Sequence, residues 1–521
     1  MFIESTQLPG SDIRTDICVI GTGPAGLALA RSLPANREIW LLEAGPAEGS
    51  DASQAEYRGK NIGLPYFDLD RCRNRQFGGS ANCWGGFCRW FDEHDFEERP
   101  RIPHSGWPLR RPDLIEFYRR AHELCGLGPL DYSYESWAAA SGQGPSVFAG
   151  PNVWPEIRQK SQFDVESVRR DLAAQPNVHV CLNANVTELV SSEDGRAVTS
   201  VIFRAPGGRT HEVRAKLFVL AAGGIENARL LLASQRVQKN GVGNDHDLVG
   251  RFFMEHIDFE AGHFHPARPE LFRNELVWLR AGPVEIRNSL AIAEPIRQRE
   301  QLLRCFFHIG DETVEHAFGY RSAEHILRRV LRGRPVHNWR YHWRNLVWDR
   351  VPLMAAAHWR LHFTRTVPRA TGRRGVWRLR MTAEPSPNPA SRVLLSRARD
   401  RFGVPRVALD WRINAEDYVH VRRSIDLFAQ DVGQLGLGRV EVKPSSEWPT
   451  RGTYHHMGTT RMHADPKRGV VDAECRVHGV SNLYVAGSSV FPTAGTGTPT
   501  LTILALTLRL AQHLADQAAP V

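Results

Sequence analysis

The sequence Gly21-Thr-Gly-Pro-Ala-Gly26 places glycines where a phosphate-bearing ligand could approach the backbone. It follows a short apolar run at residues 16–20, and residues 27–33 are apolar at helical spacing. A second apolar run follows at residues 38–42. A glycine turn between a buried strand and a helix is typical of a β–α–β unit that binds a dinucleotide.

Each residue type in this turn has a physical reason. Gly21 permits the tight bend, Gly23 lets the backbone approach a pyrophosphate, and Gly26 allows the helix to pack closely on the strand. Pro24 and Ala25 stand in the first turn of the helix, whose N-terminus carries about half a positive charge. We therefore predict that the pyrophosphate of the ligand lies at this N-terminus.

Glu43 ends the second apolar run, 22 residues after Gly21. A carboxylate at this distance can accept hydrogen bonds from the ribose hydroxyls of adenosine, and it disfavours a 2′-phosphate, which argues against NADP. This unit alone does not decide between NAD and FAD. The alternative interpretation is a tight glycine turn that binds no ligand.

Two further segments carry a series of distinctive motifs. One is FGGSANCWGGFCRWF at residues 77–91, and the other begins with YHHMGTTRM at residues 454–462 and continues to TPTL at residues 498–501. Together with the N-terminal unit, these motifs resemble those of the glucose–methanol–choline (GMC) oxidoreductases. The resemblance is nearest to the branch of pyranose oxidases and bacterial sugar dehydrogenases, and it covers roughly residues 13–260 and 380–515.

The resemblance implies an α/β fold with a Rossmann-like FAD-binding domain that is split between the two ends of the chain. The expected FAD-binding segments are residues 1–255 and 445–521. A substrate domain with a mixed or antiparallel sheet is expected at residues 256–444, with a basic helical insert at 320–380. Cys83 stands where some sugar oxidases have a histidine bonded to the flavin, so the resemblance implies noncovalent FAD. A cysteinyl–flavin link is the alternative, and a buried thiol is expected at Cys83 because free cysteines are commonly buried.

The resemblance also implies which residues surround FAD. Those expected to line the pyrophosphate and the flavin edge are Gly78, Gly79, Ser80 and Asn82. Those expected near the adenosine are Val186, through its backbone, together with Ala222 and Gly223. Those expected near the pyrophosphate, the ribityl chain and the flavin ring are Gly487, Ser488, Thr498 and Pro499.

By the same resemblance, His455 is the catalytic base, because it stands three residues before Gly458 in the family's HxxGT pattern. A neutral imidazole suits this role, since its ordinary pKa of about 6.5 lies near the working pH. Its neighbour His456 is expected to point elsewhere. His463, His478 and His513 match no family position and are interpreted as core histidines.

Thr498 occupies the position where the family usually has Asn or His beside the substrate oxygen. A hydroxyl can donate or accept a hydrogen bond, but it is not a base. We therefore assign Thr498 to substrate orientation. The helix that starts near Pro499 would direct its N-terminus at the flavin and favour an anionic reduced ring.

These residues predict an FAD-dependent oxidase or dehydrogenase that acts on an alcohol group of a polyol, sugar or sugar-like natural product. The electron acceptor is left open between oxygen, a quinone and a partner redox protein. Two other classes of function are considered: a flavin-retaining enzyme without net redox chemistry, such as a lyase, and a protein that binds a partner through the basic insert.

The formal net charge of +9 comes from one segment, because residues 321–380 contain 15 Arg, no Lys and two acids. Trp-rich basic segments can bind nucleic acid or a membrane surface. Here a lid, an oligomer contact or an acidic partner is the favoured interpretation, and no nucleic acid is expected. Scattered cysteines and the absence of a visible secretory signal favour a cytoplasmic protein without a metal site.

Overall fold

The computed structural model describes residues 1–142, 144–148, 150–272, 279–310, 376–448, 452–495 and 498–517, together with isolated positions between 323 and 346. Most of the predicted insert at 320–380 lies outside the described residues. Residues 377–380 of that insert form part of a β-strand and are therefore not helical as predicted.

The first of two large sheets contains the predicted β–α–β unit, which is confirmed: β2 (Asp12–Ile20), α1 (Pro24–Ser32) and β3 (Ile39–Leu42). The last four residues of β2 are buried, as expected for a central strand. The strand order is β1-β7-β3-β2-β10-β9-β8, and β19 pairs in parallel with β10. The other strands are β1 (Phe2–Glu4), β7 (Val178–Leu182), β8 (Asn185–Ser191), β9 (Val198–Arg204), β10 (Thr210–Leu220) and β19 (Leu483–Val485).

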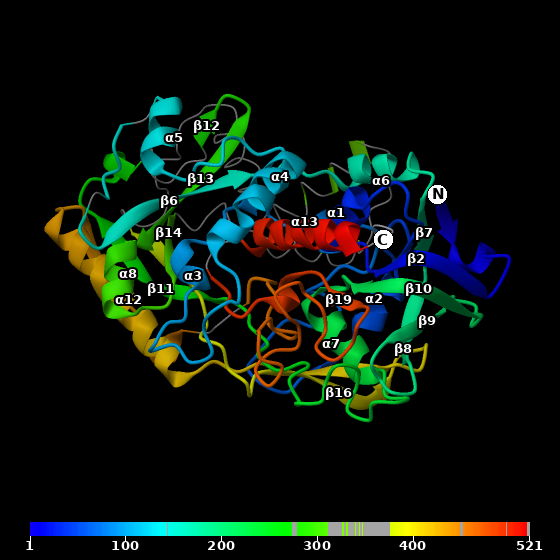
Figure 1. The fold of residues 1–521 in the computed structure, drawn as a ribbon. Helices are drawn as coiled ribbons and strands as arrows, with labels where there is room; N and C mark the ends of the chain where they lie inside the picture. Colours follow the sequence, from blue (N-terminus) through cyan, green and yellow to red (C-terminus); the bar gives the residue numbers. More distant parts are fainter. Residues whose placement is uncertain are drawn as a thin grey trace.

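The first sheet draws on both ends of the chain, because β19 comes from the C-terminal segment. β9 and β10 form the antiparallel hairpin predicted around Gly207-Gly208. The C-terminal helix α13 (Pro499–Gln517) packs against α1 and α4 (Ile115–Cys125). In Figure 1, α13 is the red helix that crosses the middle of the molecule beside α4 and α1.

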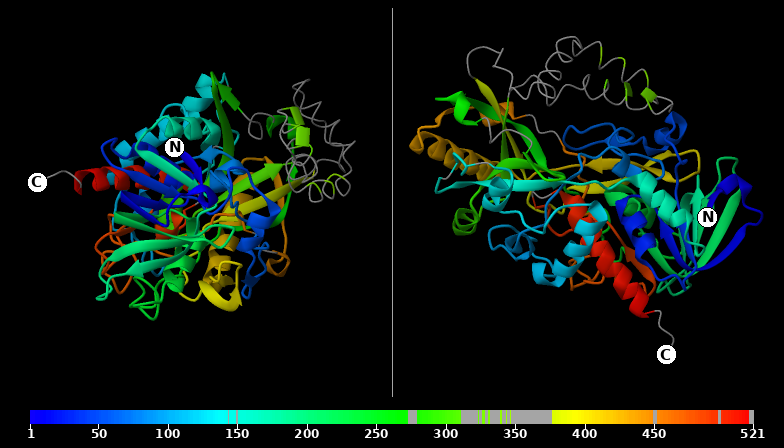
Figure 2. Two further views of the ribbon diagram at one scale, coloured as in Figure 1. Left: turned by 90° about the vertical axis from the view of Figure 1, so that its right-hand side faces the viewer. Right: turned by 90° about the horizontal axis from the view of Figure 1, so that it is seen from above.

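The second large sheet is antiparallel, with the order β18-β11-β15-β14-β13-β6-β5 and with β12 paired to β13. Its strands are β5 (Phe87–Cys88), β6 (Val153–Lys160), β11 (Ile257–Pro266), β12 (Leu279–Ala281), β13 (Val284–Ile292), β14 (Cys305–Gly310), β15 (Trp377–Ala383) and β18 (Gly438–Val442). Because β5 and β6 precede residue 255, the predicted boundary at that residue does not separate the two sheets. Figure 2 shows the two sheets toward opposite ends of the molecule.

Helix α12 (Ala415–Gln434) packs on the second sheet and was not predicted. Its buried side chains include Val421, Ile425, Phe428 and Val432, which follow the helical repeat. The predicted antiparallel pair near residues 391–411 exists as β16 (Arg392–Arg399) and β17 (Pro405–Asp410). These strands join β4 (Lys60–Asn61) in a separate three-stranded sheet rather than the large one.

The remaining helices with described bounds are short. They are α2 (Asp51–Gln54), α3 (Glu93–Phe96), α5 (Tyr134–Ala140), α6 (Val165–Ala173), α7 (Gly223–Ala233) and α8 (Glu294–Glu300). None of the described helices combines the length and apolar character that a membrane span would need.

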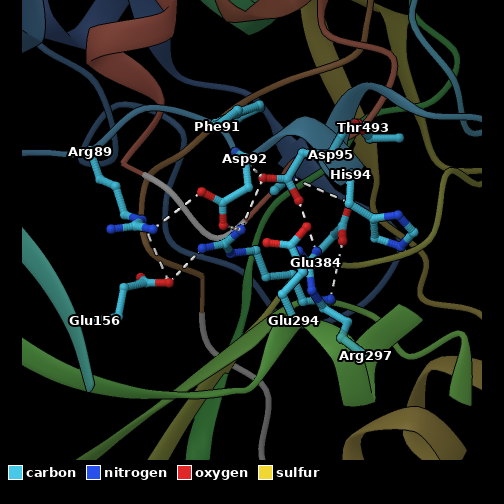
Figure 3. Close-up of polar contacts among 12 residues, drawn as sticks. Arg89, Phe91, Asp92, His94, Asp95, Glu156, Glu294, Arg297, Glu384 and Thr493 are labelled. Atoms are coloured by element: carbon cyan, nitrogen blue, oxygen red, sulfur yellow. Dashed lines mark hydrogen bonds and ion pairs between the residues drawn. The ribbon is translucent and has the colours of Figure 1, made fainter. Parts of the chain in front are cut away.

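A cluster of buried ion pairs ties the segment after β5 to the second sheet (Figure 3). Arg304 contacts Asp95 at 3.2 Å and Glu156 at 2.5 Å. Arg99 donates two hydrogen bonds to Glu384, at 2.9 and 2.7 Å, and both side chains are fully buried. Buried charges persist only when they are paired and hydrogen-bonded, so this cluster fixes how the two parts of the chain meet.

Asp431 on α12 provides a second anchor, because its buried carboxylate accepts hydrogen bonds from the backbone N–H groups of Asn152 and Val153, at 2.9 and 2.8 Å. Asp431→Ala leaves these donors unsatisfied, so we expect the free energy of unfolding to fall by about 2–4 kcal/mol. Urea denaturation followed by tryptophan fluorescence measures the change. Asp426→Ala, on the exposed face of the same helix, is the control and should change stability by less than about 0.5 kcal/mol. Equal effects of the two substitutions would contradict the anchoring role.

Candidate active site

The glycine turn after β2 is shaped by close backbone approaches. Gly21 has a φ of +107°, and a Cβ there would lie 2.6 Å from the carbonyl oxygen of Ala221. A Cβ on Gly26 would lie 1.9 Å from the carbonyl oxygen of Gly21. A Cβ on Gly79 would lie 3.2 Å from the Cα of Gly23, so the two predicted glycine segments meet.

Glu43 is buried beside this turn, and burial raises its pKa. Its carboxylate accepts hydrogen bonds from the backbone N–H and the hydroxyl of Thr22 and from the N–H of Gly45 at 2.7 Å. A carboxylate offers about four acceptor sites, so capacity for a ribose hydroxyl remains. Thr22, which the sequence analysis did not single out, positions this carboxylate and also accepts a hydrogen bond from the N–H of Gly78 at 3.2 Å.

The other residues predicted around the dinucleotide gather at the same edge of the first sheet. Val186 lies on β8, two residues after Ala184, whose N–H donates to the carbonyl oxygen of Glu43 at 2.8 Å. Ala222 caps α7 next to Gly21, and Ser488 donates a hydrogen bond to the carbonyl oxygen of His456 at 2.7 Å.

Two further glycines leave room beside this edge. Gly223 and Gly487 have φ angles of +88° and +122°, and a Cβ on either would meet no protein atom within 4 Å. Left-handed glycines that border open space suit the close approach of a ligand to the backbone. The donors and the space at this edge therefore fit the dinucleotide of FAD.

The segment around Asn82 differs in part from expectation. The Asn82 side chain donates to the carbonyl oxygens of Phe77 and Gly79, at 2.8 and 3.0 Å, and so fixes the second glycine turn. Ser80 and Asn82 are exposed. The prediction of a buried thiol at Cys83 is wrong, because the turn formed by residues 79–82 leaves this side chain exposed.

The candidate base, His455, lies in a loop that folds against the start of β11. Its Nδ1 is 2.9 Å from Nδ1 of His256 and 3.0 Å from the hydroxyl of Thr453. Its backbone N–H donates to the carboxylate of Glu255 at 3.0 and 3.1 Å. Glu255 and His256 are nearly or fully buried, and the sequence analysis did not identify either of them.

The hydrogen-bond partners of His256 and His455 determine which ring nitrogen of each carries the hydrogen. Nε2 of His256 is 2.5 Å from the carbonyl oxygen of Gly495 and must donate to it, because a carbonyl only accepts. In a neutral imidazole, Nδ1 of His256 is then an acceptor. Thr453 also accepts from His455, since its own hydroxyl donates to Glu255 at 2.8 Å. The hydrogen of His455 is therefore on Nδ1, and its Nε2 carries the lone pair.

Nε2 of His455 has no hydrogen-bond partner in the part of the chain that the structure describes. His455 lines a cavity of about 120 Å³ together with Thr498, Arg158 and His256. The hydroxyl of Thr498 is buried and has no hydrogen-bond partner among the described residues. The cavity thus combines a lone-pair nitrogen with a hydroxyl that lacks a partner, which suits a ligand with a hydroxyl group.

Burial and the nearby Arg158 guanidinium lower the pKa of His455 to about 4. Burial also lowers the pKa of His256 to about 4 and that of His456 to about 3. Because the charged imidazolium is disfavoured at each position, all three rings are neutral at neutral pH.

His456 does not line the cavity, and its Nε2 lies 2.8 Å from the hydroxyl of Tyr66. His463 and His478 bond to backbone groups, as expected of histidines satisfied by the backbone. His513 bonds to Gln517 instead, and the predicted core positions are wrong because all three side chains are only half-buried.

Glu255, His256 and His455 have ligand atoms within 4.8 Å of one another, which is a spacing that could hold a metal ion. Glu255, however, already accepts hydrogen bonds from Tyr66, Thr453 and two backbone N–H groups. The two imidazoles also share a proton. The cluster is therefore built as a hydrogen-bond chain that orients His455.

Comparison with known proteins shows which family the chain is similar to. Residues 387–507 match the family model described as GMC oxidoreductase. The chain is 24% identical to 6'''-hydroxyparomomycin C oxidase of Streptomyces lividus, over 98% of this chain and 94% of the relative. It is 23% identical to 2-methyl-1,2-propanediol dehydrogenase of Mycolicibacterium austroafricanum, over 96% of this chain and 95% of the relative.

Among solved structures, pyridoxine 4-oxidase from Mesorbium loti superposes with a TM-score of 0.58 at 17% identity, over 96% of this chain and 98% of that one. The likeness in fold extends over nearly the whole chain. Residues 387–507 thus match the GMC oxidoreductases, and the chain is an FAD-dependent enzyme of the kind that acts on CH–OH groups.

The contact between Gly26 and Gly21 generates a test of the dinucleotide site. Gly26→Ala would force its Cβ against the Gly21 carbonyl and move α1 away from the turn. We expect the purified variant to have lost most of its bound FAD, measured by the flavin-to-protein absorbance ratio. Gly207→Ala, where a Cβ would meet no atom within 4 Å, is the matched control and should retain FAD. Full FAD occupancy in Gly26→Ala would refute this placement.

Proposed function

We propose that this enzyme oxidises an alcohol group of a polyol, sugar or sugar-like molecule to a carbonyl group, with His455 as the base and Thr498 as the orienting hydroxyl. The observation that carries the proposal is the unshared lone pair of His455 Nε2 in the same cavity as the unpartnered hydroxyl of Thr498. FAD, when bound, accepts the hydride that leaves the carbinol carbon.

The residues of the chain handle the proton. His455 Nε2 takes the proton from the substrate hydroxyl while the hydride leaves the carbon, so that a C=O bond forms and two electrons leave the substrate. Thr498 bonds to the substrate oxygen and fixes its position. His256 acts through His455, because its Nδ1 accepts the Nδ1–H of His455 and so keeps the lone pair on Nε2.

The geometry of the first sheet supports a proposal for the residues that surround FAD. We propose that residues 21–26, 78–82 and 487–488 hold the pyrophosphate and the flavin edge, and that Glu43, Val186 and Ala222 hold the adenosine. Pro499 begins α13, whose N-terminal dipole would stabilise negative charge on the reduced ring. The FAD-binding part would then comprise residues 1–255 except β5 and β6, together with residues 445–521.

The relatives support the substrate class. One is named as an oxidase of 6'''-hydroxyparomomycin C and another as a dehydrogenase of 2-methyl-1,2-propanediol. We propose oxygen, a quinone or a partner redox protein as the acceptor that reoxidises the flavin. Most of the insert, which we propose as the contact for a second subunit or an acidic partner, lies outside the described residues.

The base is tested by His455→Ala. Loss of a general base lowers rates by roughly 10²–10⁴-fold, and we expect that reduction in the rate of flavin bleaching by alcohol under anaerobic conditions while FAD stays bound. His463→Ala is a matched control, because His463 is half-buried and lies outside the cavity. Bleaching of His455→Ala at the parental rate would overturn the assignment.

The lowered pKa of His455 predicts an unusual pH profile. The base must be neutral, and its pKa is about 4, so kcat/KM for flavin reduction should stay level from pH 8 down to about 5 and fall below that. Stopped-flow measurements across this range provide the test. A decline that begins near pH 6.5, the ordinary pKa of histidine, would show that the burial of His455 does not persist in the working enzyme.

A further inference from the structure

The ionisable side chains that line the cavity beside His455 are all basic or potentially basic. Its described lining contains the basic or potentially basic side chains Arg158, Arg287, His256, His308 and His455, and no carboxylate. The rest of that lining is formed by Phe87, Phe306, Thr382, Thr453 and Thr498. Besides the three threonine hydroxyls, which can bond to a carbinol, this wall offers two guanidinium groups, with Arg158 over the Phe306 ring and Arg287 over the Phe87 ring.

The two arginines are brought together by strand register. Arg158 on β6 lies directly opposite Arg287 on β13 in the antiparallel ladder. Like charges that face each other across a ladder destabilise a sheet. Both side chains line the same cavity, so an anion placed there would be attracted to two guanidinium groups at once.

Arg158 is almost completely buried, with 3% of its surface exposed. It donates to Ser289 at 2.7 Å and to Glu156 at 2.8 Å, and its guanidinium lies 3.8 Å from the centre of the Phe306 ring. Its Nε–H is buried and has no hydrogen-bond partner within the described ranges. A buried donor without a partner is costly, so this group is poised for a ligand atom.

Glu156 neutralises Arg158 only in part. The same carboxylate also contacts Arg304 at 2.5 Å and Arg89 at 3.6 Å. In Figure 3, Glu156 lies beside Arg89 at the edge of the ion-pair cluster. Burial, together with Arg287, Arg89 and Arg304, lowers the pKa of Arg158 to about 10, against the raising effect of Glu156. Arg158 therefore remains charged at neutral pH, and its charge is incompletely balanced.

We infer that the substrate is an alcohol that carries a carboxylate, such as a hydroxy acid or a sugar acid, and that Arg158 and Arg287 bind this carboxylate while His455 and Thr498 meet the carbinol. The inference rests on the proposed function. A planar carboxylate matches the planar guanidinium groups. The cavity is small compared with the several hundred Å³ of sites for drug-sized ligands, which favours the compact carboxylate over a phosphate ester.

The test compares matched pairs of alcohols on the FAD-loaded enzyme: lactate with 1,2-propanediol, gluconate with sorbitol, and glucuronate with glucose. Anaerobic stopped-flow bleaching of the flavin gives kcat/KM for each. We expect the acid of at least one pair to be favoured by about 10-fold or more. Bleaching by the neutral members equal to or faster than by the acids overturns the inference but leaves the proposed function intact. No bleaching by any of the six overturns both.

Two variants test whether Arg287 and Arg158 cause the preference for the acid. Arg287→Gln should lower kcat/KM for the favoured acid by about 10–100-fold and change that for its neutral partner by less than about threefold. Arg158→Gln should lower kcat/KM for the acid by a similar factor, and it should also raise the pH at which the rate for the neutral partner begins to fall, because Arg158 lowers the pKa of His455. Arg287→Gln leaves the contacts of Glu156 in place, so the test survives if Arg158→Gln fails to fold. Arg236→Gln, an exposed arginine paired with Glu188, is the control. Equal losses for acid and neutral substrates would mean a structural role only and would overturn the assignment.

A competition experiment tests whether the site prefers a carboxylate or a phosphate. Propionate, which offers a carboxylate but no carbinol, should inhibit reduction competitively in the parent enzyme and weakly in Arg287→Gln. Stronger competition by inorganic phosphate than by propionate would overturn the choice of a carboxylate.

Discussion

The candidate active site depends on the hydrogen bonds that the buried carboxylate of Glu255 accepts. Its donors are the hydroxyls of Tyr66 and Thr453 and the backbone N–H groups of His256 and His455. These donors belong to three regions that are distant in sequence. A buried carboxylate is tolerated only when it is bonded in this way, so the three regions must meet in one arrangement.

That arrangement explains why the adjacent side chains of His455 and His456 point in different directions. Tyr454 has a φ of +66°, a left-handed conformation that costs a non-glycine residue about 1 kcal/mol or more. Its ring stacks on Phe67, with 4.4 Å between ring centres, and the next N–H is held by Glu255. The turn therefore sends His455 toward the cavity and His456 toward Tyr66. Local strain is offset by hydrogen bonds that only the folded chain can supply.

Sequence patterns predicted what short segments determine by themselves. The turn at residues 21–26, the hairpin around Gly207-Gly208 and the helix from Pro499 depend on local glycine geometry and helical spacing, and all three are confirmed. The pairing of β6 with β13 joins residues more than a hundred positions apart, and no local pattern encodes it. His256 and Arg287 gain their chemical context only through such pairings, so no sequence pattern singled them out. Helix α12 did carry an amphipathic signal that could have been found.

Arg158 affects both parts of the proposed chemistry, the binding of the substrate carboxylate and the transfer of the proton to His455. Arg158 lowers the pKa of His455, which keeps the base neutral but also makes it weaker. A carboxylate bound beside Arg158 would offset part of this positive field and so raise the basicity of His455 once the substrate is in place. A neutral alcohol of the same shape would bring no such change. Charge on the substrate, at a position remote from the reacting carbon, would then contribute to the proton transfer as well as to binding.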